Sequence, residues 1–151
     1  RSSNFDKYPS TQIDGEAIMG WGPIVSKLQA EWGDSPVWAI DLYVGSYEED
    51  FVEAFAATGR KVIQTRSLMI GDEAVKELTD RFITDDVLFG YMSNIRLEEY
   101  FCQKKVEEAR SLLADGGKYV VVGTAAALIA PSAPVAYADM ARMAGKTDVA
   151  S

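Results

Sequence analysis

The residues most able to do chemistry lie in the stretch VWAIDLYVGSYEEDF, residues 37–51. An apolar run leads to Asp41, and a loop with Gly45 and Ser46 precedes an expected helix. Walker A loops have the same order of strand, loop and helix. Their backbone amides surround the phosphates, a Lys reaches the phosphate oxygens, and a Ser or Thr holds magnesium. The stretch therefore raises the hypothesis of a phosphate site, and the residues at the start of the helix decide it.

The start of this helix carries the wrong charge for a nucleotide. Against the uridine-kinase-type pattern I-D-G-x-S-G-S-G-K-S, Tyr47 replaces the last Gly, Glu48 the Lys and Glu49 the Ser. Unit charges about 4 Å apart interact by about 4 kcal/mol at an effective dielectric near 20, so the attraction becomes a repulsion of similar size. The alternative, which the loop alone favours, is that Glu48, Glu49 and Asp50 are ordinary acidic residues of a first helical turn.

The surrounding sequence alternates apolar runs with helical patterns. This order predicts a three-layer α/β sandwich, Rossmann-like, with a mostly parallel sheet and helices on both faces. We expect strands at residues 37–42, 61–65, 118–122 and 134–137, with a short edge strand at 11–14. We expect helices at 23–32, 48–57, 96–114 (in one or two pieces), 125–130 and 138–144, and one that Ser67 or Asp72 caps and that continues through Phe82.

Ligands of such sheets bind at the carboxyl ends of the strands. Asp41 could line this crevice or cap the next turn, and Gly123-Thr124 could offer amides to a phosphate or simply form a tight exit from a strand. Asp139 and Arg142 could form a surface pair worth about 0.3 kcal/mol, and Arg142 could instead contact a phosphate. The candidate ligand-binding residues are Asp41, Tyr43, Gly45, Ser46, Glu48, Glu49, Gly123, Thr124, Asp139 and Arg142. The sequence predicts no catalytic residue and no metal ligand set.

Composition limits the classes of function. The net charge is −8, with no histidine and one cysteine among 151 residues. A nucleic acid would be repelled, a zinc site lacks its usual ligands, and no intrachain disulfide can form. No apolar run approaches the roughly 20 residues of a membrane helix. We therefore expect one cytoplasmic α/β domain over residues 1–151, with no nucleic-acid or membrane partner.

Several segments in sequence order resemble a bacterial protein family of type I phosphomannose-isomerase-like proteins. In that family a uridine-kinase-like module precedes a cupin-type isomerase domain. The family tends to read G-T-G-A where this chain has Gly123-Thr124-Ala125-Ala126, and W-E-I-Q after the position of Arg142. The matching segments are FDKYPS, GEAIMGWGPIVSKL, VWAIDLYVGSYEEDF, DDVLFGYMSNIRLEEYF, VVVGTAAALIAP and VAYADMAR.

The resemblance implies a P-loop NTPase-like fold with a degenerate phosphate loop, the N-terminal module of a longer protein, ending before the kinase lid. It implies a non-catalytic regulatory or structural module of a mannose-6-phosphate isomerase-like protein in carbohydrate metabolism. It implies no cofactor here, zinc only in the absent cupin domain, and that domain in cis as partner. Two alternatives stay open. One is a kinase-like enzyme with residual, weak binding of a nucleotide or sugar phosphate. The other is a module for protein interaction or homo-oligomerisation.

Overall fold

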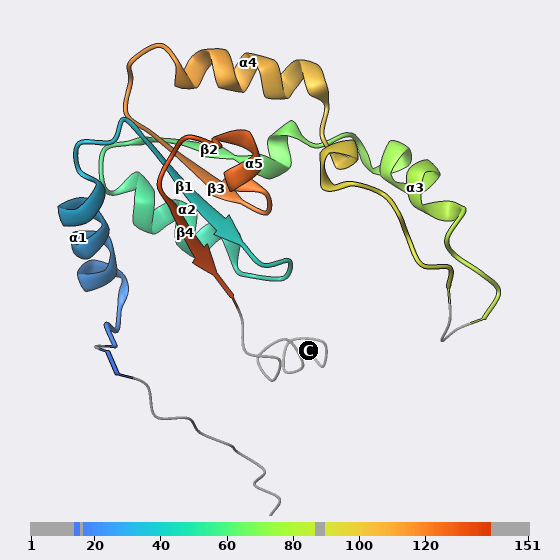
Figure 1. Ribbon diagram of the computed structural model, residues 1–151, viewed down its shortest axis with the longest axis horizontal. Coiled ribbons are helices and arrows are strands. Elements are labelled where there is room, and N and C mark those ends of the chain that lie inside the picture. The colour runs from blue at the N-terminus through green and yellow to red at the C-terminus, as the bar shows by residue number, and fades with distance from the viewer. Residues whose placement is uncertain (1–13, 16, 87–89, 140–151) are drawn as a thin grey trace, which may run out of the picture.

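A parallel β-sheet forms the centre of the protein. The computed structural model describes residues 14–15, 17–86 and 90–139, and its sheet has the strand order β2-β3-β1-β4 with every pair parallel (Figure 1). The predicted α/β class and parallel sheet are confirmed. The strands are β1 (Val37–Leu42), β2 (Lys61–Gln64), β3 (Tyr119–Gly123) and β4 (Val135–Ala138).

Helices cover both faces of the sheet because side chains alternate between the faces along each strand. Trp38 and Ile40 point to one face and pack with Phe55 of α2, while Ala39 and Val121 point to the other and pack with α4 and α5. The helices are α1 (Trp21–Trp32), α2 (Glu48–Ala56), α3 (Asp72–Asp80), α4 (Gln103–Leu113) and α5 (Ala126–Ile129), with single 3-10 turns η1 (Thr65–Leu68) and η2 (Leu97–Tyr100).

Several predicted boundaries are corrected. Neither Ser67 nor Asp72 caps α3, because Gly71 precedes the helix and Ser67 Oγ donates to Gln64 O at 2.7 Å. The helix ends at Asp80, before Phe82. The pattern at 96–114 forms two pieces, η2 and α4. The helix predicted from residue 138 is corrected at its start, since Ala138 ends β4 and Asp139 is not helical. Residues 140–144 of that helix and residues 11–13 of the predicted edge strand lie outside the described residues.

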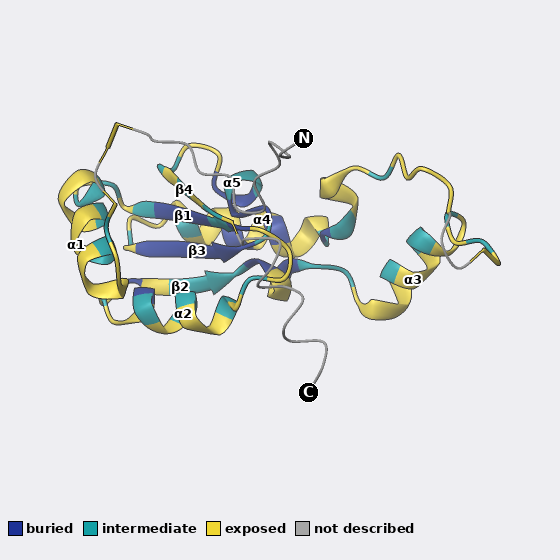
Figure 2. Ribbon diagram, turned by 90° about the horizontal axis from the view of Figure 1, so that it is seen from below, coloured by how far each residue is buried: buried dark blue, intermediate teal, exposed yellow. Residues whose placement is uncertain are grey.

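Between β2 and α4 the chain forms an extension that we call the arm, residues 69–86 and 90–100. It holds α3 and η2 and projects sideways from the sheet, and none of its described residues is buried (Figure 2). Ile83, Tyr91 and Met92 are largely exposed there, and Val75 and Leu78 of α3 are only half-buried. The arm therefore presents apolar side chains that the rest of the described chain does not cover.

Candidate functional site

The candidate site lies where β1 and β3 end side by side. Asp41 of β1 is the register partner of Gly123 of β3. From this point β1 leads into α2 on one face, and β3 leads into α5 on the opposite face. Connections that diverge in this way open a crevice at the carboxyl edge of an α/β sheet, which is the usual position for a ligand.

Asp41 closes part of this crevice with its own carboxylate. Asp41 Oδ1 accepts a hydrogen bond from Ala125 N at 3.1 Å, and Oδ2 accepts one from Ala127 N at 3.0 Å. The prediction that Asp41 caps the next turn is corrected, since its carboxylate binds amides at the start of α5, which follows the neighbouring strand β3. The amides that an incoming anion would need at the start of α5 are already bound by a carboxylate.

The exit from β3 has an unusual backbone. Gly123 has φ 129° and Ala125 has φ 66°, both in the left-handed half of the Ramachandran plot. A Cβ at Gly123 would overlap Thr65 Oγ1, from the turn that follows β2. The close approach of Thr65 explains why residue 123 is a glycine, so the interpretation as a tight exit accounts for Gly123 without any ligand. Thr124 is half-buried between these two positions.

The loop after β1 turns through Gly45, which has φ 99°. Ser46 N donates to Tyr43 O at 3.1 Å, and Tyr43 N donates to Ala138 O of β4 at 2.9 Å. The side chains of Tyr43 and Tyr47 are about half exposed, at 51% and 53%. Ser46 Oγ is buried and has no hydrogen-bond partner among the described residues. The loop is therefore tied at its base, and its aromatic side chains face solvent.

Acidic side chains surround the start of α2. Glu49 forms an ion pair with Arg66 at 3.2 Å, whereas Glu48 Oε1 is buried without a hydrogen-bond partner among the described residues. Burial raises the pKa of Glu48, and the neighbouring Glu49 raises it further, although Arg66 pulls the other way. The environment thus disfavours the charge on Glu48 despite the helix N-terminus, and it would disfavour an added phosphate for the same reason.

The substitution Glu48→Gln should make the protein more stable at pH 7. Because the folded pKa of Glu48 lies above its unfolded value, stability from this group is present below about pH 4.3 and is lost as the pH rises through the folded pKa. The gain in the free energy of unfolding should stay below about 1 kcal/mol, since solvent screens the partly exposed carboxylate. Urea unfolding from pH 3.5 to 8 measures it.

The control is Glu53→Gln on the exposed side of α2. It should leave the pH dependence unchanged. If Glu48→Gln were instead less stable than the wild type at pH 7, the charge on Glu48 would be stabilising, and our description of the loop would be wrong.

The remaining predicted residues are placed as follows. Asp139 is exposed and follows β4, whose last residue, Ala138, pairs with Leu42 of β1, so Asp139 lies at the same edge as the loop. Arg142 lies outside the described residues, and so does its predicted pair with Asp139.

No group of three or more His, Cys, Asp or Glu among the described residues is placed to hold a metal ion. In the described part of the chain, no helix has the length and apolar character to cross a membrane.

Two features were not predicted from the sequence. Arg60 is buried, donates to three carbonyls and lies 3.7 Å from the ring centroid of Trp38. A pocket of about 330 Å³ also opens at the amino ends of the strands, far along the sheet from the loop after β1. Arg60 gave no sequence signal, because an arginine between Gly59 and Lys61 is typical of a surface turn. The small residues and prolines at 130–134 were the one hint of the pocket in the sequence.

Comparison with known proteins adds one family. The model of a family described as Domain of unknown function (DUF8485) matches residues 20–150. No curated protein and no solved structure matches the chain. The matched range includes all four strands, the loop after β1 and the arm.

Proposed function

The chain belongs to the DUF8485 family, and we propose that it is a non-catalytic regulatory or structural module built on a degenerate P-loop-like site. One observation carries the proposal. Carboxylates of the chain itself lie at the carboxyl edge of the sheet, where the ligands of α/β sheets usually bind. Asp41 binds the amides that start α5, and Glu48 and Glu49 stand at the start of α2.

These carboxylates would repel a nucleotide electrostatically. A triphosphate at the loop would approach Glu48 and Glu49, and Arg66, a cation beside them, is already paired with Glu49. Repulsion between close unit charges in such a partly buried site amounts to a few kcal/mol for each pair. A nucleotide would have to overcome this repulsion without the Lys that normally attracts it.

The backbone supports the proposed relation to uridine-kinase-like modules. Ala125 stands where those modules tend to carry a glycine, and its φ of 66° is a conformation that glycine adopts without strain. Ala125 thus keeps a glycine-like backbone while its amide binds Asp41. We include in the proposal that the module serves a sugar-phosphate isomerase-like protein of carbohydrate metabolism, as the resemblance suggests.

A second candidate function, a protein-interaction module, is favoured by the arm. Its apolar side chains are uncovered, and residues 72–99 contain eight acidic and three basic side chains. A second copy would bring the same negative charge, so charge complementarity favours a different protein whose contact surface is apolar with a basic rim. This candidate is compatible with the first, because a module without catalysis must act through contacts.

The experiment is a thermal-shift titration of the whole chain with two classes of ligand. ATP, UTP, GTP and mannose 6-phosphate, each with and without magnesium, should give no shift. A ligand at about 100 times its dissociation constant would add about 2.7 kcal/mol and be readily visible. An amphipathic peptide of Leu and Lys should bind, and the matched peptide of Leu and Glu should not.

A saturable, magnesium-dependent shift with any nucleotide would overturn the first proposal in favour of a residual kinase-like enzyme. Equal binding of the two peptides, or of neither, would overturn the assignment of the arm. The two outcomes are independent, since the arm and the loop after β1 are separate ligand surfaces.

A further inference from the structure

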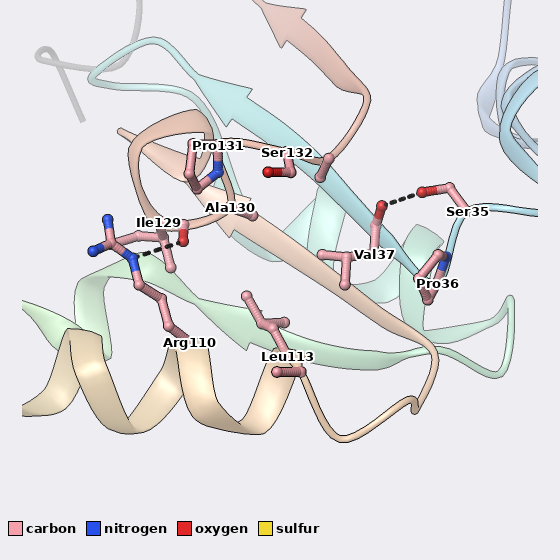
Figure 3. A pocket seen from close by; sticks show the side chains of 11 residues that line it. Ser35, Pro36, Val37, Arg110, Leu113, Ile129, Ala130, Pro131 and Ser132 are labelled. Atoms are coloured by element: carbon pink, nitrogen blue, oxygen red, sulfur yellow. Dashed lines mark hydrogen bonds between the residues drawn. The ribbon is translucent and has the colours of Figure 1, made fainter.

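The pocket at the amino ends of the strands has firm walls. Val37 opens β1, Leu113 closes α4, and Ile129 closes α5, so three elements of the core contribute its apolar surface (Figure 3). Pro36 and Pro131 line the rim and restrict the backbone there. Its volume of about 330 Å³ falls in the range of small-molecule sites. The pocket thus lies between core elements and the connecting segments 35–36 and 130–133.

Arg110 of α4 supplies the positive charge at the edge of this pocket. Its Nε donates to Ile129 O at 3.3 Å, as Figure 3 shows, and its Nη2 donates to Leu128 O at 2.8 Å. These bonds use two of the five N–H donors of the guanidinium and fix its position against the end of α5. Ser132 adds an exposed hydroxyl to the lining.

The sign of the charge in the pocket is opposite to that of the chain. No acidic side chain of the described residues lines the pocket, although the chain has 23 acidic residues and a net charge of −8. Asp115 is close in sequence, but it accepts hydrogen bonds from Gly117 N and Tyr119 Oη, each at 2.7 Å. Within the described residues Arg110 has no salt-bridge partner. Its charge is therefore not neutralised by a carboxylate there.

We propose that this pocket binds a small organic anion with an apolar body, of the class of medium-chain monocarboxylates. The carboxylate pairs with the Arg110 guanidinium, for which charge-assisted hydrogen bonds are strong. The apolar body lies against Val37, Leu113 and Ile129. Binding at this site does not depend on the function proposed above, whereas a regulatory role of the ligand rests on it.

Helix α5 connects this pocket with the carboxyl edge of the sheet. Asp41 holds the amides at one end of α5, and Arg110 holds the carbonyls at the other. A ligand on Arg110 would act on the same short helix that Asp41 caps. The pocket is thus suited to a regulatory ligand of a module that itself performs no catalysis.

The test uses butyrate, hexanoate and octanoate as probes of the whole chain, followed by calorimetry and by amide NMR shifts. Affinity should rise about fourfold for each buried methylene, and octanoate should bind at least about tenfold more tightly than the neutral 1-octanol. Arg110→Gln should weaken octanoate at least about tenfold. Lys104→Gln, an exposed cation on the same helix, should leave the affinity unchanged. The variant Arg110→Lys keeps the charge but not the planar fork, so its affinity for octanoate should fall between those of the wild type and Arg110→Gln.

Three results would overturn the proposal. They are absence of octanoate binding to the wild type, octanol binding as tightly as octanoate, and Arg110→Gln binding as tightly as the wild type. Ala114→Phe provides a second variant that does not depend on Arg110, since it fills the pocket from an exposed position at the end of α4. Unchanged octanoate affinity in Ala114→Phe would place the probe elsewhere and would also overturn the proposal.

Discussion

The substitution Gly123→Ala should lower the free energy of unfolding by about 3–5 kcal/mol, the largest effect we expect from adding one methyl group. Two costs combine at this position. Gly123 has φ 129°, which an alanine adopts only with strain of about 1–3 kcal/mol. The new Cβ would also overlap Thr65 Oγ1 and lie 3.2 Å from Thr65 Cβ, in a core with no room for it. Urea unfolding of the purified variant measures the loss.

Gly116→Ala is the matched control for this prediction. Gly116 also has a positive φ, 85°, but a Cβ added there would meet no other part of the described chain within 4 Å. Gly116→Ala should therefore lower the free energy of unfolding only by the cost of backbone strain, about 1–2 kcal/mol. The double variant Gly123→Ala with Thr65→Ala should recover part of the loss, because the overlapping hydroxyl is gone. Equal losses for Gly123→Ala and Gly116→Ala would show that Thr65 does not restrict this position.

The sheet could be predicted from the sequence because its signals are local. The apolar run at Val37–Leu42 was expected as a strand with the bounds that β1 has. Strand β2 ends one residue earlier than predicted, and β3 and β4 each begin and end one residue later than predicted. Alternating strands and helices leave few arrangements other than a parallel sheet with helices on both faces. The order β2-β3-β1-β4 was not predicted, because it depends on which strands pair and not on where they lie in the sequence.

The candidate site was predicted in outline only. The rule for α/β sheets pointed to Asp41 and Gly123, and the structure brings them together as register partners. The bonds that define the site were beyond a local pattern, since Asp41 lies 84 and 86 positions from its partners Ala125 and Ala127. Arg110 and the pocket could not be predicted from a local pattern either, because a gap between packed elements leaves no periodic signal in the sequence.

Arg60→Met should cost about 3–4 kcal/mol of unfolding free energy. Arg60 donates to Ser35 O and Pro36 O at 3.0 Å each and to Tyr119 O at 3.4 Å, so it joins the segment before β1 to β3. A hydrogen bond from a charged donor is worth about 1.5–3 kcal/mol, and the carbonyls left behind would be partly buried without it. Met keeps an unbranched apolar side chain against Trp38, so the loss reports on the guanidinium. Chemical unfolding at pH 7 measures it.

Lys118→Met, at an exposed cation beside β3, is the control, and its free energy of unfolding should stay within about 0.5 kcal/mol of the wild type.

Burial lowers the pKa of Arg60, which shows that the charged guanidinium bears a desolvation cost. Replacing a buried charge by an apolar group is sometimes neutral for this reason. At Arg60 we expect the loss of the bonds to prevail, because Arg60→Met removes three hydrogen bonds from a charged donor at once, and of the three carbonyls Pro36 O keeps a bond from Tyr119 N at 2.9 Å. Arg60→Lys should fall between, since one ammonium cannot reproduce the planar fork. A Met variant as stable as the wild type would mean that desolvation cancels all three bonds.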